Sequence, residues 1–184
     1  MRILPRNSAR SAPSSSPPRE RGAITVVSAL VALLLVGIVG VALDTAWTLT
    51  ARMQLQRTAD AAALAAAAQL RVPGQTAYGL VRQAAVDTAN SNGVVGCGTS
   101  GIQLEPNPGN AAGGDVVVGR WKFDTAANRF WFDPADPDPD AVQVRARCGT
   151  GSLNPALTLF FGPLFGQATS EGGRSAIARV GETD

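Results

Sequence analysis

An uncharged apolar run near the N-terminus constrains this chain more than any other feature. Residues 23–43 carry no charged side chain, and Thr25 and Ser28 are their only polar ones. At about 1.5 Å per residue a helix of this run extends about 31 Å, and the hydrocarbon core of a bilayer is about 30 Å thick. In lipid, a single segment satisfies its backbone amides only as a helix. The run therefore predicts a transmembrane helix over residues 23–43.

A cleaved secretory signal is the alternative interpretation of this run. The apolar core of such a signal spans about 7–15 residues and ends at a small-x-small site, whereas here a longer run precedes Asp44-Thr45-Ala46-Trp47. Residues 1–22 hold five arginines against Glu20 alone, and positively charged flanks stay in the cytoplasm. We expect a single-pass membrane protein, with a cytoplasmic N-terminus and a periplasmic or extracellular C-terminal part.

Composition argues against two classes of function. The formal net charge of +2 arises in the N-terminal arm, because the residues from 45 onward hold 11 basic and 12 acidic side chains. This near balance leaves no excess of positive charge that would bind nucleic acid. The chain contains no His, so neither a Ser-His-Asp nor a Cys-His arrangement can form. We expect no enzymatic activity, no cofactor, no small-molecule substrate and no nucleic-acid partner.

The segments on either side of the span have distinct compositions. Residues 1–22 are rich in Ser, Pro and Arg and predict a disordered cytoplasmic arm. Residues 44–72 are rich in good helix formers and predict an extracytoplasmic extension of the same helix, to about Leu70, before Pro73-Gly74 breaks it. Apolar and small residues recur along this extension at spacings near three to four: Leu49, Met53, Ala59, Ala63, Ala66 and Leu70.

Residues 73–184 predict one small α+β extracytoplasmic domain. Apolar residues at helical spacing between Tyr78 and Ala89 predict a second, short helix. Alternating and β-branched segments then predict a hairpin, a further strand and a last strand, over residues 116–123 and 130–132, 141–147 and 175–180. Residues 156–165 predict a short buried helix or turn on the sheet. The fold class is α+β, a long N-terminal transmembrane helix extended outside the membrane, a second short helix and a small antiparallel β domain.

The two cysteines, Cys97 and Cys148, both fall in the part expected outside the cytoplasm. In an oxidising compartment an even pair favours one disulfide, and two unpaired thiols are the alternative. With no His and no further Cys, the chain offers no zinc ligand set.

Two clusters in the predicted domain could bind a ligand. Four carboxylates crowd the loop after the hairpin, where oxygen ligands could hold Ca²⁺: Asp133, Asp136, Asp138 and Asp140. Prolines hold this loop extended, and it lacks the Gly and distal Glu of an EF-hand, which favours a solvated acidic loop. The aromatic residues of the hairpin could form a binding platform, although alternate hairpin residues more often fill a small core.

Three segments near the N-terminus form a distinctive set. They are the entry to the span, its exit and the Ala-rich block beyond it, namely Arg21-Gly22-Ala23-Ile24-Thr25-Val26-Val27, Val41-Ala42-Leu43-Asp44 and Gln56-Arg57-Thr58-Ala59-Asp60-Ala61-Ala62-Ala63-Leu64-Ala65. These segments resemble the TadG-like (TadE/TadG-type) proteins of the Tad (Flp) pilus-assembly system. Later segments resemble the exported part of the same group, among them Asn154-Pro155, Phe160-Phe161-Gly162 and Leu164-Phe165-Gly166.

The resemblance implies a non-enzymatic component of a bacterial adhesion and secretion apparatus, anchored in the bacterial inner membrane. It also implies a pilin-like arrangement of the fold and a minor-pilin-like or assembly-platform role. Its expected partners are the lipid bilayer and other pilin-like or Tad assembly subunits. Related pilin-type precursors are cut after a Gly, which makes Gly22 and Ala23 the possible processing site. A Glu at the fifth mature position is typical of them, and Val27 stands there, which argues against cleavage. A membrane-tethered module that binds Ca²⁺ or another ligand is the alternative function.

Overall fold

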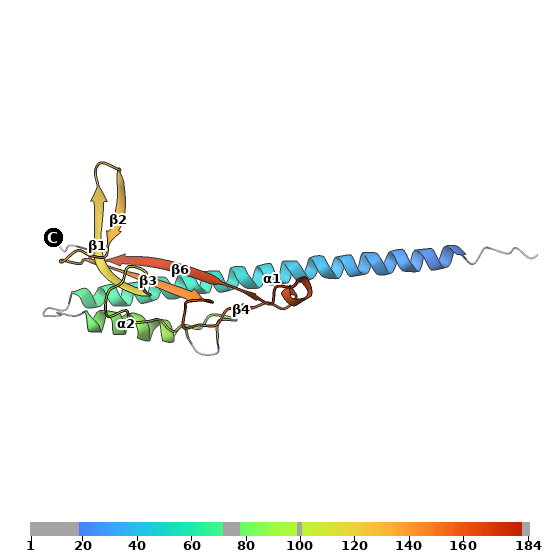
Figure 1. Ribbon diagram of the computed structural model, residues 1–184, viewed down its shortest axis with the longest axis horizontal. Coiled ribbons are helices and arrows are strands. Elements are labelled where there is room, and N and C mark those ends of the chain that lie inside the picture. The colour runs from blue at the N-terminus through green and yellow to red at the C-terminus, as the bar shows by residue number, and fades with distance from the viewer. Residues whose placement is uncertain (1–18, 72–77, 99–100, 182–184) are drawn as a thin grey trace, which may run out of the picture. The chain divides into compact units, whose positions relative to one another are not determined.

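The computed structural model describes residues 19–71, 78–98 and 101–181, with side chains from residue 22 onward (Figure 1). The chain forms two compact units, Met1–Val39 and Gly40–Asp184. The expected disorder of the arm falls mainly on residues 1–18, and the expected break at Pro73-Gly74 falls within residues 72–77. Both segments lie outside the described residues.

The first helix, α1 (Arg19–Leu70), begins four residues before the predicted span and ends at the predicted residue. In the first unit its large apolar side chains face outward: Ile24 is 67 % exposed and Leu33 is 70 % exposed. Among the described residues, α1 is the one helix long and apolar enough to cross a membrane. The outward-facing apolar side chains suit a membrane anchor.

In the second unit the Ala-rich part of α1 is built into the core. Its buried face repeats at intervals of three and four residues and comprises Ala51, Leu55, Thr58, Ala59, Ala62, Ala63, Ala66 and Ala67. Three alanines of the predicted stripe, Ala59, Ala63 and Ala66, lie on this buried face, whereas Leu49 and Met53 are 51 % and 56 % exposed. Small side chains let neighbouring elements approach the helix closely, so this face can be covered without large residues.

A four-stranded antiparallel sheet has the order β2-β1-β3-β6 (Figure 1). Its strands are β1 (Val116–Asp124), β2 (Arg129–Asp133), β3 (Ala141–Cys148) and β6 (Gly172–Arg179). All four correspond to predicted segments. Val116, Val142 and Val144 of β1 and β3 join the alanines of α1 in one core. The second helix, α2 (Gly79–Asn90), adds Val81, Ala85 and Ala89 to the same core. These elements confirm the α+β fold class.

The segment between β3 and β6 forms a projecting hairpin. Two short strands, β4 (Leu157–Thr158) and β5 (Thr169–Ser170), pair antiparallel and flank the 3-10 helix η1 (Gly162–Phe165). We call residues 160–165 the tip. The sequence predicted a buried helix or turn over residues 156–165. Leu157 is buried, but the burial is wrong for most of the tip: Phe160 is 65 % exposed, Leu164 78 % and Phe165 62 %. The short helix extends away from the four-stranded sheet instead of packing on it.

Candidate functional site

Asp44 on α1 holds the tip through its carboxylate. The backbone N–H of Phe160 donates to Asp44 Oδ1 at 2.9 Å, and those of Phe161 and Gly162 donate to Oδ2 at 3.0 and 2.7 Å. Asp44 is only 9 % exposed, so these donors replace water around a buried charge. They also lie at the beginning of η1, where unpaired N–H groups favour a negative partner.

Two glycines allow this close approach. A Cβ on Gly40 would lie 2.7 Å from the ring of Phe161, and a Cβ on Gly162 would lie 2.1 Å from the carbonyl oxygen of Gln167. Gly162 also accepts the backbone N–H of Gln167 at 2.9 Å, which closes the turn. A larger residue at Gly40 would push the tip off α1, and a larger residue at Gly162 would distort the turn that presents its N–H to Asp44.

Trp47, one helical turn after Asp44, completes the contact. Its indole ring meets the ring of Phe160 edge to face, with centroids 5.2 Å apart, a favourable geometry for an aromatic pair. Trp47 is also partly buried against the core. Asp44, Trp47 and the tip form what we call the Asp44 latch.

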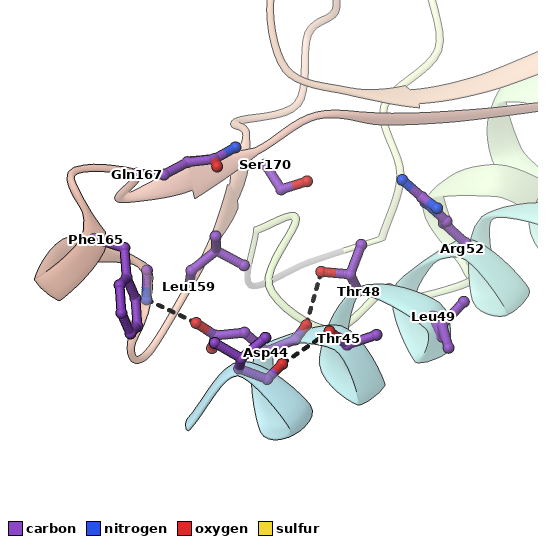
Figure 2. Close-up of a pocket in the computed structure, with 11 residues that line it drawn as sticks. Asp44, Thr45, Thr48, Leu49, Arg52, Leu159, Phe165, Gln167 and Ser170 are labelled. Atoms are coloured by element: carbon purple, nitrogen blue, oxygen red, sulfur yellow. Dashed lines mark hydrogen bonds between the residues drawn. The ribbon is translucent and has the colours of Figure 1, made fainter. Parts of the chain in front are cut away.

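An open groove of about 400 Å³ lies beside the latch. Figure 2 shows Asp44 pointing from α1 toward the tip, with Thr48 and Arg52 further along the same helix. Gln167 and Ser170 face the groove from the hairpin. The hydroxyl of Thr48 donates to the carbonyl oxygen of Asp44 at 2.8 Å, and both carboxylate oxygens of Asp44 accept backbone N–H groups. The polar groups nearest the tip therefore maintain the fold.

The acidic loop is neutralised by cations of the neighbouring strands. Lys122 Nζ lies 2.7 Å from Asp133 Oδ2 and 2.5 Å from Asp136 Oδ2. Hydrogen bonds from Lys122 lower the pKa of Asp133 and of Asp136, and these bonds raise the pKa of Lys122. The other two acidic residues also have partners, Asp138 with Arg120 at 2.9 Å and Asp140 with Arg179 at 2.8 Å. Among the described residues no group of three or more His, Cys, Asp or Glu could hold a metal ion.

The aromatic residues of the hairpin do not fill the core. Phe123, Phe130 and Trp131 are 48 %, 56 % and 42 % exposed, so the expectation of a core role is wrong for these three. The physical reason is the register: β1 pairs with β3 over residues 116–119, while residues 120–124 pair with β2 alone. The outer part of the hairpin projects from the sheet (Figure 1), with Trp121 stacked on Phe130 at 5.9 Å.

Cys97 and Cys148 form a disulfide with a Cα–Cα distance of 5.8 Å. Both residues are buried, and the bond joins the loop after α2 to the end of β3. Nearby, the side-chain amide of Asn154 donates to the carbonyl oxygens of Gln103 and Arg147 at 2.9 and 2.8 Å. These contacts hold irregular segments onto the sheet. Gly22 and Ala23 lie within α1, where Gly22 has no neighbour that a Cβ would meet.

Sequence reasoning missed the Asp44 latch. It gave no role to Asp44, which follows the apolar run, and it predicted a buried helix or turn over residues 156–165. The two sides of the latch are separated by more than a hundred residues in the sequence, and backbone N–H donors have no sequence signature. The available signal was that Val41-Ala42-Leu43-Asp44 and Phe160-Phe161-Gly162 both belonged to the resemblance with TadG-like proteins.

The fold and the latch define an α+β protein whose long N-terminal helix suits a membrane anchor and also contributes to a small β-containing unit. Residues 22–69 of this helix match the family model described as Tad, Putative Flp pilus-assembly TadE/G-like. The match confirms the predicted resemblance to Tad/Flp pilus-assembly proteins over this segment and supports a role in Flp pilus assembly. No curated protein and no solved structure matches the chain.

Proposed function

We propose that this protein is a non-enzymatic, membrane-anchored component of Flp pilus assembly that acts by packing α1 against partner subunits. The match of residues 22–69 to the Tad-like family model is the observation that carries this proposal. The matched segment is α1 almost entirely, so the family feature is a helix and not a pocket.

The exposed face of α1 in the second unit supports helix packing. Leu49, Met53 and Leu64 are 51 %, 56 % and 66 % exposed and recur at helical spacing. The opposite face is buried in the core of the same unit. An apolar stripe of this kind suits a neighbouring helix from another membrane-anchored subunit, whose close approach removes it from water.

The charge distribution and the cysteines support the proposed topology. Five arginines against one glutamate in residues 1–22 favour a cytoplasmic N-terminus. The disulfide between Cys97 and Cys148 suits an oxidising compartment on the other side of the membrane. We also propose that the chain remains uncut between Gly22 and Ala23, because the apolar Val27 offers no counter-charge to a new amine in lipid.

The test is photo-crosslinking in cells that assemble Flp pili. A photoreactive amino acid replaces Met53 on the exposed stripe, and Leu80 on α2, which is 59 % exposed, serves as the matched control. We expect adducts with other membrane-anchored Tad subunits from position 53 only, and loss of pili when the gene is deleted. Normal piliation without the protein, together with no adduct at position 53, would refute the proposal. The intact mass of the purified protein checks whether the N-terminus is retained.

A further inference from the structure

The tip is an unusual surface for the outside of a small domain. Phe160, Leu164 and Phe165 are 65 %, 78 % and 62 % exposed, while the core beneath them consists largely of Ala and Val. Residues 148–170 contain no charged side chain, so the whole hairpin lacks the groups that normally keep a surface loop in water. Contiguous apolar exposure of this kind indicates a surface that is covered in use.

The Asp44 latch fixes where along α1 the tip lies. Its three N–H donors bind Asp44, and the ring of Phe161 packs at Gly40. Residues 40–43 are the last of the apolar run. Since the helix rises about 1.5 Å per residue, the tip is held within about 6 Å, along the helix axis, of the last residue of the run.

We propose that the tip inserts into the lipid bilayer at the membrane surface where α1 emerges, as a second membrane contact beside the helix. The proposal rests on α1 being the membrane anchor. The apolar surface of the tip is continuous with that of α1. One apolar groove of about 530 Å³ lies between the tip and α1 and is lined by Leu43, Trp47, Phe160 and Phe161. Phe and Leu are among the side chains that interfacial segments bury at the membrane surface, and the absence of charge means that insertion needs no anionic lipid.

A second copy of the chain or a partner helix is the competing occupant. The lipid is favoured because residue 44 immediately follows the apolar run, so a bilayer that contains residues 23–43 reaches the level of the tip without any further component. A protein partner would have to cover the tip at this same level of the bilayer, in place of the lipid. The two occupants differ in what they admit: lipid admits dissolved oxygen to the tip, whereas a tightly packed protein excludes it.

The experiment places a nitroxide label on the full chain in phosphatidylcholine vesicles and compares its collisions with lipid-soluble oxygen and with a water-soluble nickel complex. Leu164→Cys carries the label at the tip, and Leu64→Cys, 66 % exposed on the part of α1 furthest from the apolar run, is the matched water-facing control. Both native cysteines are bonded to each other and take no label. Because Leu164 is 78 % exposed, the label leaves the core undisturbed.

We expect the label at position 164 to collide more often with oxygen than with the nickel complex. The label at position 64 should collide more often with the nickel complex. A label at position 164 that favours nickel would overturn the proposal, and so would one shielded from both reagents, which would indicate a protein contact. Leu33→Cys reports on the anchor itself. Oxygen preference at position 33 with nickel preference at position 164 would refute the tip contact alone, whereas nickel preference at both positions would refute the membrane anchor as well. Phe165→Cys gives an independent second reading of the tip.

Discussion

Substitution of Asp44 by alanine should release the tip while leaving the core folded. The three N–H groups that donate to Asp44 lose one shared acceptor. A hydrogen bond to a charged group contributes about 1.5–3 kcal/mol. The three bonds are not independent, because they share one carboxylate and one turn, and the freed N–H groups can reach water at the exposed tip. We therefore expect a loss of about 3 kcal/mol in the local stability of the tip, equivalent to two bonds at the low end of this range.

The assay is hydrogen–deuterium exchange of the peptide that contains residues 158–168, measured on the full chain in detergent micelles. A loss of about 3 kcal/mol corresponds to roughly hundredfold faster exchange of the amides at positions 160–162. Thr45→Ala is the matched control, because this neighbouring hydroxyl is exposed and donates only to the carbonyl oxygen of Val41 at 2.8 Å. Equal protection of the tip in Asp44→Ala and in the wild-type protein would refute the latch.

Three further predictions concern the second unit. Replacing Cys97 and Cys148 together by Ser opens a loop with a sequence separation of 51 residues, and we expect denaturant unfolding to show a loss of about 4 kcal/mol. Leu55→Ala, at 1 % exposure in the core, should cost about 2–5 kcal/mol in the same assay, whereas Leu64→Ala should change stability little. The lowered pKa values of the two aspartates bound to Lys122 predict a stabilising contribution that is full above their unfolded-state pKa, about 3.9, and is lost as the pH falls through their folded values. NMR titration of these carboxylates should therefore show higher midpoints in Lys122→Met, and unchanged midpoints would contradict the pairing.

Local patterns were sufficient to predict most of the fold. The helix end at Leu70 follows from the composition of residues 44–72, and the strands follow from alternation of apolar and polar residues. The phase of the buried face of α1 was harder, because alanine occupies nearly every position from 59 to 68 and leaves little contrast between faces. The predicted stripe therefore included the large residues Leu49 and Met53, which lie on the exposed face of α1.

The tip and the aromatic hairpin were mispredicted for a different reason. Sequence reasoning assigns large apolar residues to the core, because burial in the same chain is the usual way to remove them from water. Phe160, Leu164 and Trp131 are exposed here. The rule therefore fails where a residue is placed on a projecting hairpin by strand register or by a contact with a distant carboxylate. Neither cause can be read from the neighbouring sequence.

The Asp44 latch has a consequence for how the depth of the helix in a membrane is set. A free aspartate at the end of an apolar run keeps its carboxylate in water and thereby resists being drawn inward. The carboxylate of Asp44 instead accepts hydrogen bonds from three backbone N–H groups of its own chain. These donors replace water, and they move with the helix. Any inward slide of α1 must carry the tip along or break three hydrogen bonds to a charge. In a membrane-anchored chain, the depth of the anchor would thus depend on the folding of the second unit as well as on hydropathy.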